Sequence, residues 1–271
     1  MNRPDEDVTD LGPATFWPRL KTTRLGRVFA LLPSCGSTSD EVSARAGAAD
    51  EGLLVAAEEQ TGGRGRRGRA WHSPAGENLY ASLLLRPALP APQVAPLTLV
   101  AGVAVARALR ALGFAPRLKW PNDVLLDTTA GLRKVAGLLT EMASEGERVR
   151  HVVLGVGINV NAVGFPADLA DVATSLRLVR GAAVERAAVL AEFLNAFEPL
   201  YEEWRTHGPA AGLDEWRHYG ILGQRGWVAR GGERLEGVAA AIDESGALLL
   251  RTDVGDTVPI HAGEVNWLSR P

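Results

Sequence analysis

The sequence predicts an α+β fold, in which a mixed β-sheet with helices is followed by a small all-β domain. Up to about residue 219, apolar runs typical of strands alternate with longer helical segments. From Gly220 onward, short alternating strands are separated by glycine-containing turns, which is typical of a small barrel-like domain. We predict an N-terminal arm over residues 1–30, a main domain over 31–219 and a small β-barrel domain over 220–271.

The elements follow in order along the chain. The arm is rich in proline and charge, and its periodicity is weak. The hydroxyls of Ser37, Thr38 and Ser39 precede a short helical run, where one of them can cap the helix and the row can bind polar ligand atoms. The aromatic residues of the run 190–204 recur at helical spacing, so we assign them to the core. We expect the other strands at residues 53–57, 78–86, 117–120, 124–126, 134–142, 151–160, 224–229, 234–242, 247–252, 257–260 and 264–268, and a buried helix at 97–112.

Composition points to a soluble intracellular protein. The 271 residues are 46% hydrophobic, which is enough for a sizeable core. A formal net charge of −3 provides no global basic field for nucleic acid or membranes. Cys35 is the single cysteine, so an internal disulfide is excluded and a reducing compartment fits. No secretory signal opens the chain and no apolar run reaches the ~18 residues that span a bilayer, so we expect a cytoplasmic protein.

Two common ligand-site patterns are missing from the sequence. The five histidines are scattered, and none lies at metal-ligand spacing from a cysteine or a carboxylate. No G-x-x-x-x-G-K-[ST] pattern is present, so any nucleotide must be held in another way.

The most distinctive stretch is an arginine- and glycine-rich loop over residues 60–71. Four glycines and four arginines alternate between Gly62 and Arg69. Glycines allow successive N–H groups to turn into a concave anion nest, because a positive φ costs them little. Arginines add permanent charge and paired donors suited to phosphate or carboxylate. The loop therefore predicts closure over an anionic ligand.

Three other interpretations of this loop are open. Gly63-x-Gly65-x-x-Gly68 matches the dinucleotide fingerprint formally, but that motif must open a helix, and turn-forming residues follow here. Arginine-glycine segments that bind nucleic acid are usually longer and disordered. A purely structural surface loop would need counter-charge, since no acidic residue lies among the four arginines. We favour an anionic small molecule.

Several motifs, in one order, resemble the biotin protein ligase family over about residues 34–268. The arginine-glycine loop and the Lys-Trp-Pro-Asn-Asp motif are together highly specific for it. The matching stretches are Ser37-Thr38-Ser39, Gln60 with Gly63-Arg64-Gly65-Arg66-Arg67-Gly68-Arg69-x-Trp71, Lys119-Trp120-Pro121-Asn122-Asp123, Lys134-x-x-Gly137 and Gly155-x-Gly157-Ile158-Asn159-Val160.

The resemblance implies a fold, a reaction and ligands. The fold would be a class II synthetase-like catalytic domain with an SH3-like C-terminal barrel. The reaction would join biotin and ATP, with Mg²⁺, into biotinyl-5′-AMP and pass biotin to one lysine of a biotin carboxyl carrier protein. A carboxylate that attacks a phosphate must overcome anion–anion repulsion, so such a site needs fixed cations.

The resemblance also implies roles for the loop. Gly63, Arg64, Gly65 and Arg66 would contact biotin and its adenylate, and Arg64 would also be catalytic. Arg67 and Arg69 would support the phosphate side. Trp71 would pack beside the adenylate once the loop orders, which would also keep water from the reactive anhydride.

The remaining family motifs imply further roles. Lys134 would be catalytic, between the biotin carboxylate and the bridging phosphate oxygens, with Gly137 against the ligand. Lys119 and Asn122 would lie near the nucleotide, and Asp123 near Mg²⁺ or the attacking lysine; as a plain alternative, Asp123 caps a turn. The ureido ring of biotin would be surrounded by Ser37, Thr38, Ser39 and Gln60, and its bicyclic ring would have room beside Gly155 and Gly157.

Several alternatives and unknowns accompany this resemblance. Some family members carry an N-terminal DNA-binding domain of about 60 residues, but only about 33 residues precede Cys35-Gly36-Ser37 here. We therefore expect the ligase-only type, without DNA or membrane binding. A lipoate- or octanoyl-transferring enzyme of the same fold is the first alternative, with Cys35 its only candidate nucleophile, and a nucleic-acid-binding module is the second. The sequence does not reveal the carrier, the Mg²⁺ ligands, the role of the C-terminal domain, or whether the chain forms a homodimer.

Overall fold

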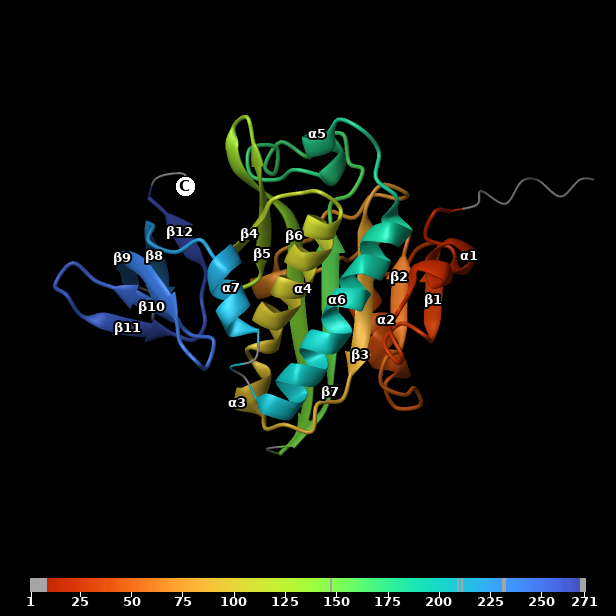
Figure 1. Cartoon of the computed structure of the whole chain (residues 1–271), viewed down its shortest axis with the longest axis horizontal. Helices are drawn as coiled ribbons and strands as arrows, with labels where there is room; N and C mark the ends of the chain where they lie inside the picture. Colours follow the sequence, from red (N-terminus) through yellow and green to blue (C-terminus); the bar gives the residue numbers. More distant parts are fainter. Residues whose placement is uncertain (1–8, 147, 209, 211, 231–232, 269–271) are drawn as a thin grey trace, which may run out of the picture.

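The computed structural model describes residues 9–146, 148–208, 210, 212–230 and 233–268. A seven-stranded mixed sheet with the order β1-β2-β3-β7-β6-β5-β4 forms the main body, and a separate five-stranded sheet lies beside it (Figure 1). The α+β prediction is therefore confirmed.

The main sheet is antiparallel except where β1 pairs with β2. Its two longest strands, β6 and β7, form a hairpin whose register pairs Gly137 with Gly157. Its strands are β1 (Phe29–Leu32), β2 (Leu54–Ala57), β3 (Leu79–Leu85), β4 (Pro116–Lys119), β5 (Asp123–Thr128), β6 (Gly131–Glu145) and β7 (Arg148–Ile158).

Long helices cover one face of this sheet. α4 (Leu97–Ala111) and α6 (Arg186–His207) pack against each other in front of it (Figure 1). The rings of Phe193, Phe197, Tyr201 and Trp204 stack in series and are buried, as their spacing predicts. The opposite face carries α2 (Thr38–Arg45) over β2, β3 and β7. The short helical elements are α1 (Pro13–Phe16), η1 (Trp17–Arg19), η2 (Arg66–Gly68), α3 (Ala91–Val94), α5 (Leu176–Arg180) and α7 (Leu213–Tyr219).

One helical segment has the length and hydropathy of a membrane span, contrary to the expectation from the sequence. It runs from Ala91 to Ala111, through α3 and α4, and 72% of its apolar window is buried inside the protein. Its apolar character follows from its place between the sheet and α6, which makes it a core helix.

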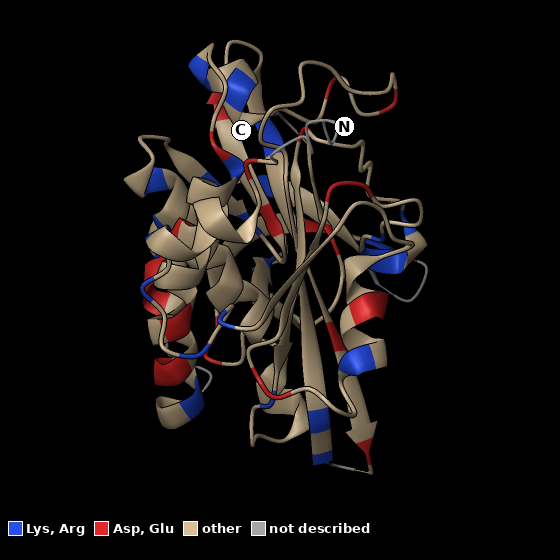
Figure 2. Cartoon of the chain, turned by 90° about the vertical axis from the view of Figure 1, so that its right-hand side faces the viewer, with Lys and Arg blue, Asp and Glu red and all other residues tan. Residues whose placement is uncertain are grey.

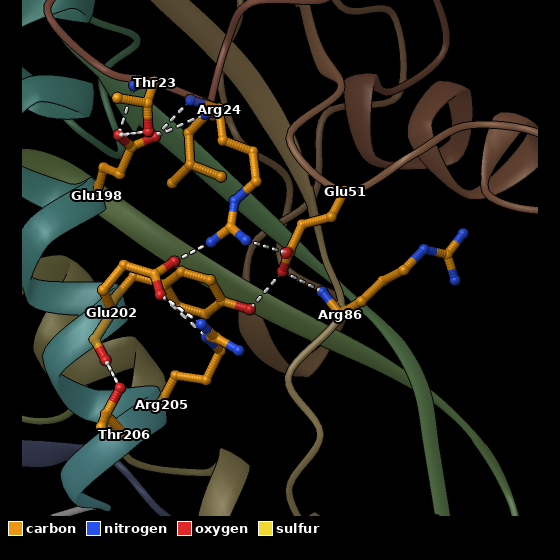
Figure 3. A network of polar contacts seen from close by, with 10 residues as sticks. Thr23, Arg24, Glu51, Arg86, Glu198, Glu202, Arg205 and Thr206 are labelled. Carbon is orange, nitrogen blue, oxygen red and sulfur yellow. Dashed lines mark hydrogen bonds and ion pairs between the residues drawn. The ribbon is translucent and has the colours of Figure 1, made fainter.

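The segment predicted as an N-terminal arm packs into the main core from residue 9 onward; residues 1–8 lie outside the described part. The side chains of Leu11, Phe16, Leu20 and Leu25 are 0–6% exposed. Downstream, the carboxylate of Glu198 on α6 accepts the backbone N–H groups of residues 23, 24 and 25 at 2.6–3.0 Å (Figure 3).

The C-terminal sheet is antiparallel with the order β11-β10-β9-β8-β12. It is joined to the main domain where the indole N–H of Trp120 donates to the carbonyl of Gly246 at 3.0 Å. The predicted turn at Gly231-Gly232 lies outside the described residues. The strands are β8 (Arg225–Arg230), β9 (Glu233–Ile242), β10 (Leu248–Arg251), β11 (Thr257–Ile260) and β12 (Val265–Trp267).

Candidate functional site

A cavity of about 520 Å³ lies where the arginine-glycine loop, the N-terminus of α2, strands β5–β7 and strand β12 meet. This volume is typical of small-molecule sites. Side-chain alternation explains its floor: Leu138 and Val156 belong to the core under α4 and α6, so Gly137, Gly155 and Gly157 face the other side of the sheet.

One end of the cavity is lined by buried neutral polar groups. Ser37 caps α2 by accepting the N–H of Ser39 at 3.3 Å. The hydroxyls of Thr38 and Ser39 lie 2.8 and 3.0 Å from that of Ser82. The side-chain oxygen of Gln60 accepts the N–H of Thr38 at 2.9 Å. Donors and acceptors without charge therefore gather at this end, which suits a neutral polar ring.

The other end carries Lys134 and the turn between β4 and β5. The Nζ of Lys134 lies 2.6 Å from a carboxylate oxygen of Asp123 and 5.2 Å from the ring centroid of Trp71. Asn122 donates to the carbonyl of Leu138 at 2.9 Å, which fixes the turn against β6. The short β4–β5 hairpin thus holds an amide and a carboxylate beside the lysine.

Trp71 lies directly against the glycines of the floor. A Cβ atom added to Gly157 would be 2.5 Å from the indole, and one added to Gly137 would be 2.9 Å from it. The sequence predicts that Gly155 and Gly157 leave room for a ligand ring, but the space beside Gly157 holds the Trp71 ring in this structure. A Cβ at Gly155 would instead lie 3.1 Å from the hydroxyl of Ser39.

Arg64 and Arg69 have counter-charges from distant elements. Arg64 forms a paired contact with Asp40, with both N–O distances 2.7 Å, and lies 3.3 Å from Glu141. These contacts raise the pKa of Arg64, and the Arg64 hydrogen bond lowers the pKa of Asp40. Arg69 lies 2.9 Å from Glu264 of the C-terminal domain.

Arg66 is held differently. It is half-buried, and one guanidinium nitrogen donates to the carbonyl of Gly263 at 3.1 Å. Burial lowers its pKa, and the neighbouring Arg67 adds to this. Within the part of the chain that the structure describes, no carboxylate lies within 4.0 Å of its nitrogens. Arg66 is therefore the loop cation that is most available to an anion inside the cavity.

The structure brings together most residues that the sequence singled out. Gly63 and Arg67 do not line the cavity. Gly63 lies under the loop, where a Cβ would be 2.8 Å from the carbonyl of Trp71, and Arg67 is exposed with φ +58°. The predicted residues that do line the cavity are Ser37, Thr38, Ser39, Gln60, Arg64, Gly65, Arg66, Arg69, Trp71, Lys119, Asn122, Asp123, Lys134, Gly137, Gly155 and Gly157.

Asn159, from the motif that begins at Gly155, also lines the cavity, and the other lining residues belong to no motif that the sequence singles out. Ser82 could have been found only as a polar residue inside an otherwise apolar strand. Phe165, Leu169 and Val172 come from a loop after β7 and add an apolar wall. Trp267, on β12, has a buried indole N–H with no acceptor among the described residues, as does Trp71.

Residues 33–159 match the Biotin/lipoate A/B protein ligase family, and residues 221–266 match the Biotin protein ligase C terminal domain. Biotin--[acetyl-CoA-carboxylase] ligase of Paracoccus denitrificans is 37% identical over 87% of this chain and 98% of its own length. Bifunctional ligase/repressor BirA of Bacillus subtilis is 41% identical over 76% of this chain, which spans only 64% of that relative. The biotin protein ligase of Aquifex aeolicus in complex with biotin and ATP superimposes with a TM-score of 0.76 and 28% identity, covering 88% of this chain and 97% of that one.

Proposed function

The chain belongs to the biotin protein ligases, and we propose that it uses ATP to attach biotin to a lysine of a biotin carboxyl carrier protein through biotinyl-5′-AMP. One observation carries the proposal: a single cavity joins a buried cluster of neutral hydroxyl and amide groups to a cationic end. Biotin has the same polarity, with a neutral ureido ring at one end and a carboxylate at the other.

The first half-reaction joins the two substrates. A carboxylate oxygen of biotin attacks the α-phosphorus of ATP, and the bond to pyrophosphate breaks. Both partners are anions, so their approach requires fixed positive charge. Lys134 supplies it from the floor, and Arg66 from the loop, because both line the same cavity.

Asp123 has a positioning role toward Lys134. At 2.6 Å it holds the ammonium group of Lys134 at the start of β5. In the second half-reaction the carrier's lysine amine attacks the acyl carbon, the bond to AMP breaks, and the amine loses a proton. Among the described residues, Asp123 is the carboxylate that pairs with Lys134 in the cavity, and in this proposal it orients that amine.

Mg²⁺ would neutralise the ATP phosphates. It is usually held by one or two carboxylates together with phosphate oxygens and water. The described residues contain no cluster of three metal-binding side chains. Three carboxylates, those of Asp123, Asp171 and Glu264, line the cavity, and any one of them would fit this mode of binding.

The lipoate alternative is not favoured. The relative from Paracoccus denitrificans and the solved structure from Aquifex aeolicus are biotin ligases by name, and Cys35 does not line the cavity. Burial and the nearby Glu41 and Asp40 also raise the pKa of the Cys35 thiol, which disfavours a thiolate nucleophile.

The proposal extends to partners. The acceptor would be the biotin carboxyl carrier subunit of acetyl-CoA carboxylase or of another biotin-dependent carboxylase, and the protein would act in the cytoplasm. DNA binding is not expected, because the formal net charge of −3 provides no global basic field. Both basic and acidic residues occur along the ribbon in Figure 2. In this proposal a homodimer forms through β1, the outermost strand of the main sheet among the described residues, and sedimentation would test whether the dimer exists.

The test is direct. The protein is incubated with ATP, Mg²⁺, biotin and a carrier domain, and the carrier is weighed by mass spectrometry. We expect the carrier to gain one biotinyl group on its target lysine, with one AMP and one pyrophosphate released. A mass gain from lipoate, and not from biotin, would overturn the proposal.

A further inference from the structure

The arginine-glycine loop is anchored at Arg64 to both walls of the cavity. Residues 63–71 form a hairpin in which the N–H of Gly65 donates to the carbonyl of Arg69 at 2.7 Å and the N–H of Trp71 donates to the carbonyl of Gly63 at 2.9 Å. Arg64 stands in the first strand of this hairpin. Its side chain reaches Asp40 on α2 and Glu141 on β6.

The two carboxylates occupy the donors that a ligand would need. Asp40 takes both terminal nitrogens of the guanidinium at 2.7 Å, and Glu141 shares one of them with both of its oxygens at 3.3 Å. A paired, charge-assisted contact of this kind fixes direction as well as distance. The terminal nitrogens of Arg64 are thus occupied by protein carboxylates, whereas Arg66 has no carboxylate partner among the described residues.

The two acidic residues lie on two different walls of the cavity, so together they can fix the position of the loop. Asp40 follows the three hydroxyl residues at the start of α2, and Glu141 lies four residues after Gly137 on β6. A loop tied to both elements is held above the cavity floor, where Trp71 covers Gly137 and Gly157.

We infer that Asp40 and Glu141 are positioning residues that hold the loop closed through Arg64, and that Arg64 acts as this latch rather than as a cation for the ligand. The expected consequence, that the latch slows release of the adenylate, rests on the proposed function. Loop closure can be measured without substrate, so it is tested separately.

Limited trypsin digestion measures closure without substrate. The loop contains four arginines, and cleavage there follows the population of the open loop. The variants are Asp40→Asn and Glu141→Gln. Glu41→Gln is the matched control, because Glu41 lies in the same turn of α2 but pairs with Arg45. An exposed ion pair contributes up to about 1 kcal/mol, so we expect cleavage roughly fivefold faster in both variants and unchanged in the control.

A double-mutant cycle identifies Arg64 as the shared partner. Arg64→Gln should open the loop as much as Asp40→Asn and Glu141→Gln together, with cleavage read at the three remaining arginines. Adding Asp40→Asn to Arg64→Gln should then change nothing further. If the effects of Arg64→Gln and Asp40→Asn on cleavage were additive, or if Asp40→Asn were cleaved at the wild-type rate, the latch would be refuted.

Release of the adenylate distinguishes the latch from a ligand cation. If the latch holds, Asp40→Asn and Glu141→Gln each speed adenylate dissociation roughly threefold to fivefold. Asp40→Glu, which keeps the carboxylate, should dissociate the adenylate at the wild-type rate. If Arg64 serves the ligand, Asp40→Asn frees the guanidinium and dissociation slows, which overturns the inference. A protein that forms no adenylate would refute the proposed function while the digestion result stands.

Discussion

Replacement of Lys134 by alanine tests the chemistry most sharply. A unit charge about 4 Å from a developing negative charge stabilises it by about 4 kcal/mol at an effective dielectric constant of 20. That corresponds to a factor of about 10³ in rate. Lys134 is 28% exposed and shares its charge with Asp123, so we expect the lower end, a roughly 10²-fold loss in adenylate formation.

The same substitution should barely affect the fold. It removes one charged hydrogen bond from a pair whose lysine is partly exposed, a loss of about 1 kcal/mol. In a chain of this size that lowers the melting temperature by about 2–4 °C.

The assay follows pyrophosphate release with saturating biotin and ATP, beside a thermal melt. Lys21→Ala serves as the control, because Lys21 is exposed and lies outside the cavity. Adenylate formation within threefold of the wild type would refute the role of Lys134. A collapsed melting curve would show that the loss reflects misfolding and would also remove the assignment.

The remaining predictions concern the loop, the floor and the thiol. Gly157→Ala places a methyl group 2.5 Å from Trp71 and should displace the loop, which would weaken biotin binding at least tenfold (about 1.4 kcal/mol). Gly47→Ala is the control, because a Cβ at Gly47 meets open space. Equal biotin affinities of the two variants in calorimetry would contradict this prediction. Arg66→Gly should release the adenylate early, so unchanged dissociation would remove Arg66 from the site. Cys35→Ser should keep full ligase activity. In the wild type, burial raises the pKa of the Cys35 thiol, so alkylation of Cys35 should be slow at neutral pH and should speed up only above the ordinary thiol pKa. Rapid alkylation at pH 7 would contradict this.

Local sequence patterns predicted the framework well. The aromatic residues of α6 recur with helical period, and the structure stacks them in the core as expected. Pro121-Asn122-Asp123 marked the tight connection between two strands. Motifs separated by more than a hundred residues, such as Ser37 and Gly157, line one cavity. The helical period and the turn depend only on neighbouring residues, and the site residues belong to recognisable motifs. Both kinds of feature can therefore be read from the sequence.

What the sequence could not predict depends on long-range contacts. Leu11 and Phe16 have no periodic neighbours, so nothing local indicated that they join the core. The arginines of the loop appeared to lack counter-charge, because Asp40, Glu141 and Glu264 come from three distant elements. Likewise, the hydropathy of α4 arises from burial on most sides, which only the packing reveals.

The most direct test of the central claim is thermal stability with biotin, ATP, lipoate, and biotin plus ATP. A ligand that binds only the folded state at 100 times its Kd stabilises it by about 2.7 kcal/mol. We predict a shift with biotin plus ATP that clearly exceeds the shift with either alone, because a tightly held biotinyl-adenylate forms in the cavity. A larger shift with lipoate, or no shift with any of these ligands, would contradict the assignment of this cavity to biotin and ATP.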